Sequence, residues 1–195
     1  MHKLTSFLPE NTLDFVQEWL KPYWVYLKIR KPRQTKLGDY RYLAQEKAHQ
    51  ITVNVDLEKP LFFLTLTHEI AHMHAFGTYG FRIAPHGKEW KVIFGRLILQ
   101  TIDYYPIEIQ ADLLQYAKNP KAIFNRGTQL SRQLMPKKTD DTLYLEDLPI
   151  GSVFSLKEKI FKSIELRRTR YLCEEIRTRR RYLVNKMAEV TLVKS

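Results

Sequence analysis

The amino-acid sequence predicts an α+β fold followed by a small antiparallel β appendage. Two segments near the N-terminus, 25–29 and 51–55, alternate apolar and polar residues as half-buried strands do. Segments with helical spacing occupy most of residues 60–118, and short runs rich in strand-forming residues return after residue 143. Strands, then helices, then strands again are typical of an α+β chain with a separate β region.

The first elements follow from apolar spacing and from the residues that interrupt it. Asn11 is placed to cap a first helix, and Pro22 ends that helix. The two alternating segments are strands, and Gly38 with Asp39 predicts a turn between them. We expect the second strand, 51–55, to lie at an edge where it can pair with an extended peptide.

The central part of the chain is predicted to be helical. Pro60 suits the first turn of a long and largely buried helix, which Gly77 and Gly80 end. A second helix follows Pro85 and stops before Pro106. A third core helix is expected up to residue 119, and a further helix at 122–134.

A polar stretch separates these helices from the C-terminal strands. The expected organisation is a main domain at 1–135, a linker at 136–142 and a small basic β domain at 143–195. In the last domain, strand-forming runs recur around the following residues: Val153, Ile160, Tyr171, Tyr182 and Val190.

Composition narrows the class of protein. With 44% hydrophobic and 27% charged residues among 195, the chain matches ordinary globular proteins. Its apolar runs are far shorter than the roughly 20 residues that a bilayer crossing needs, and its first residues lack the apolar stretch of a secretory signal. We therefore expect a cytoplasmic protein without membrane contact. Because Cys173 is the only cysteine, any metal must be held by His, Asp or Glu.

The positive charge is concentrated at the C-terminal end. The chain has a net charge of +11, and residues 151–195 contribute 12 basic against 5 acidic residues. Such a surface favours acidic partners, nucleic acid first and DNA as one candidate, with Tyr171 and Tyr182 available to stack on bases. The alternative interpretation is a basic strand edge that prevents aggregation. The candidate nucleic-acid-binding residues are Arg167, Arg168, Arg170, Arg177, Arg179, Arg180 and Arg181.

The long predicted helix contains the sequence HEIAH at 68–72. In a chain of this composition a His-Glu-x-x-His pattern is expected only about 0.01 times by chance. On a helix, His68 and His72 share one face with Cβ atoms ~5–6 Å apart, close enough for both imidazoles to bind one Zn²⁺. Glu69 projects to a neighbouring part of the surface, where it can act as a general base toward water.

A catalytic zinc ion needs a third protein ligand and an open position. His86 is the first candidate, because it stands after a loop and just before a new helix, so the chain can fold back to the metal. Glu108 is the alternative, because the pattern Glu-x-x-Ala-Asp at 108–112 resembles the second-helix pattern of another zinc-peptidase group. His74 lies about 200° around the helix axis from His72 and is expected to point away.

These motifs resemble the SprT-like zinc metallopeptidase family. HEIAH at 68–72 is followed by HGKEW at 86–90, and RQTKLGDYR at 33–41 with ITVN at 51–54 resembles the segment that leads to the family's active-site helix. The resemblance covers roughly residues 20–105. It implies a zincin-like core, in which a small sheet packs on an active-site helix and further helices, related to the Spartan protease that digests DNA–protein crosslinks.

The resemblance also assigns roles to individual residues. It implies His68, His72 and His86 as ligands of one Zn²⁺ and Glu69 as the catalytic acid and base. Two features depart from the family: the interval at 73–85 is longer than in many members, and the Cys-rich zinc ribbon of some relatives is replaced by a basic β appendage.

Three functions are compatible with these observations. The first is a zinc-dependent metalloendopeptidase that hydrolyses peptide bonds, with DNA-bound or DNA-crosslinked proteins as the expected substrates. The alternative is a non-catalytic module, in which zinc holds the fold and the basic tail recruits nucleic acid or protein. Hydrolysis of a substrate other than a peptide ranks last, because a ligand set defines chemistry better than substrate.

Overall fold

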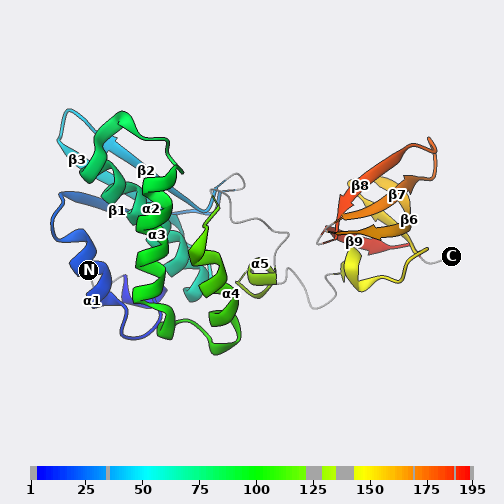
Figure 1. Ribbon diagram of the computed structural model, residues 1–195, viewed down its shortest axis with the longest axis horizontal. Helices are drawn as coiled ribbons and strands as arrows, with labels where there is room; N and C mark the ends of the chain where they lie inside the picture. The colour runs from blue at the N-terminus through cyan, green and yellow to red at the C-terminus, as the bar shows by residue number, and fades with distance from the viewer. Residues whose placement is uncertain are drawn as a thin grey trace. The chain divides into compact units, whose positions relative to one another are not determined.

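The computed structural model describes residues 4–33, 36–121, 129–134, 143–168, 170–186 and 188–193. Contacts divide the chain into two compact units. The N-terminal unit comprises Met1–Phe124 and Gln133–Met135, and the C-terminal unit comprises Asn125–Arg132 and Pro136–Ser195. Figure 1 draws the first in blue to green and the second mainly in yellow to red. The structure is a mixed α+β one, and the expected linker at 136–142 lies outside the described residues.

The N-terminal unit contains a three-stranded mixed sheet. Its strands are β1 (Val25–Arg30), β2 (Gly38–Leu43) and β3 (Ala48–Asn54), in the order β1-β3-β2. β1 pairs parallel to β3, and β2 pairs antiparallel to it. The expected edge position of residues 51–55 is therefore wrong, because β3 is the central strand with a partner on each side.

The turn predicted at Gly38 and Asp39 is also wrong, since both residues belong to β2. Tyr40 and Tyr42, which favour strands, continue the same segment and outweigh the two turn-forming residues. The chain turns later, at residues 44–47, where Lys47 has a φ of 50°.

The helices are α1 (Leu13–Leu20), α2 (Lys59–Tyr79), α3 (Lys88–Gln100), α4 (Ile107–Lys118) and α5 (Gln129–Leu134), with short 3-10 turns at Thr5–Phe7, Gly80–Arg82 and Ile102–Tyr104. The core helices match the sequence predictions closely. At the start of α1, however, the N-cap is Thr12 and not Asn11, which has a φ of 60°. Of the helix expected at 122–134, residues 122–128 lie outside the described residues.

α2 forms the centre of the N-terminal unit. It packs against β2 and β3 on one side and against α3 on another, and α3 in turn packs against α4. Most α2 side chains are buried, as expected for a helix that is apolar on all sides. Pro60 lies in its first turn, and Gly80, with a φ of 66°, ends it. Gly77 stays inside the helix, where the Tyr23 ring occupies the space that a side chain would need.

The C-terminal unit is an antiparallel sheet in the order β4-β9-β5-β6-β7-β8. Its strands are β4 (Leu143–Tyr144), β5 (Val153–Leu156), β6 (Lys159–Arg167), β7 (Arg170–Glu175), β8 (Arg181–Asn185) and β9 (Glu189–Leu192), and a 3-10 turn at Leu145–Asp147 follows β4. Among the described residues, its hydrophobic core cluster includes Leu145, Leu148, Phe154, Phe161, Tyr171, Cys173, Val184 and Val190.

Two further properties concern the chain as a whole. Cys173 is fully buried, and burial raises the pKa of its thiol to about 11, so it is a core residue. None of the helices in the described part of the chain combines the length and the apolar character that a bilayer crossing requires.

Candidate metal centre

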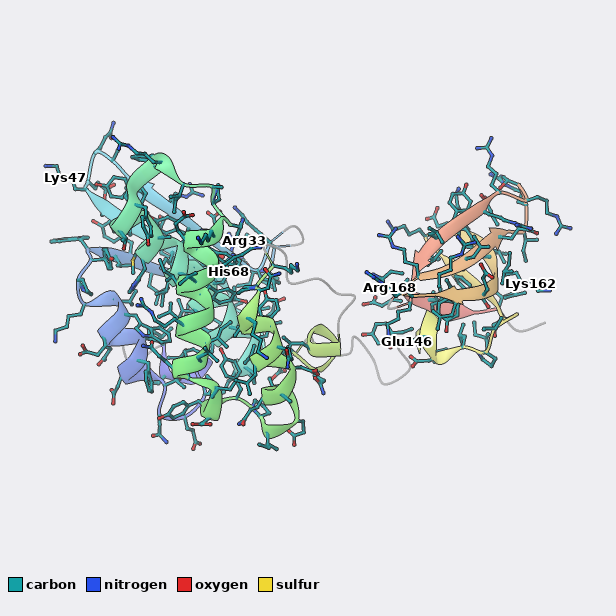
Figure 2. The ribbon with its side chains drawn as sticks, in the orientation of Figure 1. Arg33, Lys47, His68, Glu146, Lys162 and Arg168 are labelled. Carbon is teal, nitrogen blue, oxygen red and sulfur yellow. The ribbon has the colours of Figure 1, made fainter. Side chains whose placement is uncertain are left out.

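Three histidines from two elements of the N-terminal unit converge on one point. His68 and His72 lie one turn apart on α2, and His86 lies just before α3. Their Nε2 atoms form a small triangle, 3.2 Å from His68 to His72, 3.0 Å from His72 to His86 and 3.2 Å from His86 to His68. Figure 2 labels His68 in this unit.

The triangle fits a metal ion better than it fits hydrogen bonding. A neutral imidazole nitrogen either carries a proton or offers a lone pair, so three nitrogens cannot each donate and accept around a ring. Three lone pairs directed at one cation remove this conflict. Two nitrogens bound to a tetrahedral zinc at ~2.0–2.1 Å are separated by ~3.3–3.4 Å, close to the distances observed.

Burial keeps these imidazoles neutral. It lowers the pKa of His68 to about 2 and that of His72 to about 3, and the neighbouring imidazoles add to the effect. Burial also lowers the pKa of His86. The three lone pairs are therefore available at neutral pH, which a metal ligand requires.

The long interval between the motifs is mostly regular structure. α2 continues from His72 to Tyr79, and the 3-10 turn at Gly80–Arg82 reverses the chain. A second turn, in which the Gly87 N–H donates to the Ala84 carbonyl at 2.9 Å, then brings His86 to the metal centre and starts α3.

The indole ring of Trp90 packs against all three histidines. Its ring centroid lies 4.7 Å from His68, 5.3 Å from His72 and 4.7 Å from His86, and the side chain is fully buried. Its indole N–H also donates to the His68 carbonyl at 3.5 Å. In the sequence, Trp90 is singled out only as part of the segment HGKEW at 86–90, which does not predict this contact. The available signal was its spacing of four residues from His86.

Glu69 lies beside the triangle, buried between α2 and β2. Glu69 is only 6% exposed to solvent. This burial raises the pKa of its carboxyl group to about 8. Asp39 raises the pKa further, whereas Arg33 and Lys36 lower it. Glu69 is therefore a base strong enough to hold a proton near neutral pH.

Gly38 explains how Glu69 reaches this position. A Cβ atom on residue 38 would lie 2.5 Å from Glu69 Oε1, 2.8 Å from Glu69 Cγ and 2.8 Å from Thr65 Cγ2. Real side chains do not approach so closely. The start of β2 therefore packs its bare backbone against the carboxylate, a role that the sequence interpretation of Gly38 as a turn residue missed.

A hydrogen-bonded segment holds the basic groups near Glu69. Arg33 Nε donates to Asn54 Oδ1 at 2.8 Å, and Asn54 Nδ2 donates to the Lys36 carbonyl at 3.0 Å. Lys36 Nζ then pairs with Asp39 at 2.7 Å. Asn54, the last residue of β3, thus connects the sheet to the basic segment that resembled the family motif; Figure 2 labels Arg33.

Two other sequence candidates lie away from the triangle. Glu108 is in the first turn of α4 and outside the histidine group, and its carbonyl accepts from Gln133 Nε2 at 3.4 Å. His74 points elsewhere, as predicted, and its Nε2 donates to the Trp19 carbonyl at 2.8 Å. The structure therefore brings His86, and not Glu108, to His68 and His72.

The C-terminal arginines do not form one cluster. Arg167, Arg168 and Arg170 lie at the β6–β7 end of the sheet, whereas the group at 177–181 lies at the β7–β8 end. β7 separates the two groups by about 17 Å, from its residue count and the rise per residue. Figure 2 labels Arg168 in this unit.

Some of these side chains are already engaged. Arg167 pairs with Glu165 at 2.8 Å, and Arg179 pairs with Glu174 at 2.9 Å. The expected stacking role of Tyr171 is wrong, because strand alternation turns its ring into the core, where it is only 6% exposed. Tyr182 is partly exposed.

The sequence profile of the SprT-like family matches residues 11–111. The match covers more than half of the chain and includes the histidine triangle and Glu69. No curated protein and no solved structure matches the chain.

Proposed function

The chain belongs to the SprT-like family, and from this premise we propose that its N-terminal unit is a zinc-dependent endopeptidase with a zincin-like core. The observation that carries the proposal is the convergence of three neutral imidazole nitrogens within 3.2 Å of one another, next to the buried carboxylate of Glu69. His68, His72 and His86 would hold the ion. When bound, zinc acts as a Lewis acid that polarises the scissile carbonyl and acidifies water.

Glu69 is the residue that moves the proton. In the proposed reaction its carboxylate accepts a proton from the attacking water and then delivers it to the leaving amine. Burial suits this role because it raises the pKa of the carboxyl group to about 8. Arg33 and Lys36 act in the opposite direction, because their positive charges favour the carboxylate form and lower the pKa.

β2 offers a route for the substrate backbone. It hydrogen-bonds to β3 on one side, and among the described residues its other edge has no strand partner. β2 also begins at Gly38, in contact range of Glu69. An extended peptide paired with this edge would run past the carboxylate of Glu69. Because such pairing uses main-chain hydrogen bonds, it does not require a particular peptide sequence.

The ligand set favours catalysis over a purely structural metal. Structural zinc sites are closed by four protein ligands, whereas catalytic sites keep one position open. Within the described ranges, the candidate group consists of three histidines. A non-catalytic module in which zinc holds the fold is therefore the second proposal, and a fourth protein ligand in a zinc-loaded structure would favour it.

The test compares wild type with Glu69→Gln and His86→Ala. We expect wild type to bind one zinc per chain and to cleave an unfolded protein. Glu69→Gln should keep the zinc and lose cleavage, because only the base is removed, whereas His86→Ala should lose both. Full cleavage by Glu69→Gln would overturn the assignment of the base.

The proposed substrate class is proteins bound or crosslinked to DNA. It is supported by the two basic ends of the C-terminal sheet and by the net charge of +11. A DNA-binding protein should be cleaved faster on DNA than free in solution. Equal cleavage rates with and without DNA would contradict this substrate class and indicate a peptidase without preference for DNA-bound proteins.

A further inference from the structure

A groove of about 600 Å³ lies next to the metal centre and is lined by residues of α3 and of the end of α4. It begins at His86, one of the three converging histidines, and continues along α3. The residues that line it are His86, Gly87, Lys88, Lys91, Val92, Gly95, Arg96, Leu99, Ala117 and Lys118.

The groove is strongly basic. Lys88, Lys91, Arg96 and Lys118 contribute four positive charges, and the described lining contains no carboxylate. Lys91 Nζ donates to Asn119 Oδ1 at 3.0 Å, which is a neutral partner. Four like charges in one groove raise the local concentration of an anionic ligand.

The lining residues of α3 follow helical spacing, so they form one continuous face. From Lys88 to Leu99 this face is about 16 Å long, the length of roughly five residues of extended peptide. Two aliphatic side chains on it are unusually exposed, Val92 at 64% and Leu99 at 51%. Gly95, which has no side chain, lets the backbone of Ala117 approach α3, and both residues line the groove.

The chemistry of the lining distinguishes two anionic ligands. Surfaces that bind single-stranded nucleic acid combine positive charge with aromatic rings on which bases stack. Apart from the imidazole of His86, the groove lining consists of aliphatic, glycine and cationic residues. This combination fits a peptide that alternates carboxylate and aliphatic side chains.

We propose that this groove is a substrate subsite that binds acidic and aliphatic side chains of an extended polypeptide, on one side of the bond to be cleaved. The inference deepens the proposed peptidase function and rests on it, because the groove is connected to that site through His86. The subsite makes the enzyme select cleavage sites that are flanked by acidic segments.

The experiment measures kcat/KM for three matched peptides with one cleavable centre. Their five-residue flanks contain Glu and Leu, Gln and Leu, or Lys and Leu, placed in turn on either side. We expect at least a tenfold preference for the Glu peptide over the Gln peptide on one side only, and the Lys peptide should be the poorest substrate. In the double variant Lys91→Ala/Lys118→Ala this ratio should fall toward one.

Lys21→Ala is the matched control, because it removes an exposed lysine that follows α1, pairs with Glu18 and is not among the residues that line the groove. It should retain the preference. If wild type cleaves the Glu and Gln peptides equally, the subsite is wrong while the peptidase function stands.

A binding assay separates the subsite from the peptidase function further. It measures the fluorescence anisotropy of labelled peptides that bind to the Glu69→Gln variant. Tighter binding of the Glu peptide that weakens in Lys91→Ala/Lys118→Ala supports the subsite even if no peptide is cleaved. An oligonucleotide that binds more tightly and displaces the Glu peptide would assign the groove to nucleic acid and overturn the proposal.

Discussion

Gly38→Ala should impair catalysis through a displacement of the base. The new Cβ would lie 2.5 Å from Glu69 Oε1 and 2.8 Å from Glu69 Cγ, about 1 Å inside ordinary contact. The backbone of residue 38 is not in the left-handed region, so the substitution adds a clash without backbone strain. The carboxylate end is the more movable partner, and a shift of about 1 Å in a reacting group can cost ~10²-fold in rate.

The assay is kcat on an unfolded protein substrate, measured together with zinc content and thermal unfolding. We expect a loss of ~10²-fold in kcat with unchanged zinc, because the atoms nearest to the new Cβ belong to Glu69 and Thr65 and not to the histidines. Overpacking should lower stability by about 1–3 kcal/mol. Adding Thr65→Ser removes Cγ2, the obstructed atom that does not belong to Glu69, and should recover stability more than activity. Wild-type kcat in Gly38→Ala would refute the reasoning.

Further predictions concern the base, the thiol and the basic ends of the second sheet. Glu69→Gln should lower kcat by at least ~10²-fold at full zinc occupancy, measured by metal analysis and single-turnover cleavage. Burial raises the pKa of the Cys173 thiol from 9.0 to about 11. Between these pH values the folded form keeps a proton that the unfolded chain loses. The C-terminal unit should therefore lose stability as the pH rises from about 9 to 11. Urea titrations of Cys173→Ala should show a flatter pH dependence; an equal slope would contradict it. If both ends of that sheet contact phosphates, Arg168→Ala and Arg180→Ala should each reduce the salt dependence of DNA binding, whereas salt-independent binding would exclude phosphate contacts.

The metal site could be predicted largely from the sequence because two of its three histidines, His68 and His72, lie on one helix. Two histidines four residues apart on a helix must share a face, whatever the rest of the fold. His86 could be proposed only from its place before a new helix, and Glu108 remained an alternative. The choice depended on two turns, at Gly80–Arg82 and at the Ala84–Gly87 hydrogen bond, whose geometry apolar spacing does not specify.

The sheet could not be predicted to the same extent because strand order is non-local. The alternating pattern of β3 was recognised, but the same pattern is compatible with an edge or a central position. β2 was missed because its first residues, Gly38 and Asp39, normally favour turns. That error affects the proposed site, since β2 begins at the contact with Glu69 and, among the described residues, its outer edge has no strand partner.

In the C-terminal unit, successive side chains of β7 face opposite sides of the sheet, and this changes the predicted nucleic-acid-binding surface. Tyr171 and Cys173 face the core, so neighbouring residues of β7 face outward with Arg170. The sequence placed a tyrosine and arginines close together, but strand alternation separates them onto opposite faces. The pairing of Arg179 with Glu174 also joins residues across a turn, which residue counts do not reveal.

Removal of the metal should destabilise one unit selectively. Without an ion, three imidazole nitrogens within 3.2 Å cannot all be satisfied by hydrogen bonds, so zinc should bind the folded form far better than the unfolded chain. Each tenfold excess of free zinc over its Kd then adds ~1.4 kcal/mol to the stability of the N-terminal unit. All three tryptophans, Trp19, Trp24 and Trp90, lie in that unit. Tryptophan fluorescence should therefore report a lower Tm after chelation, restored by zinc in wild type but not in His86→Ala, and an unchanged Tm after complete zinc removal would show that the triangle holds no ion.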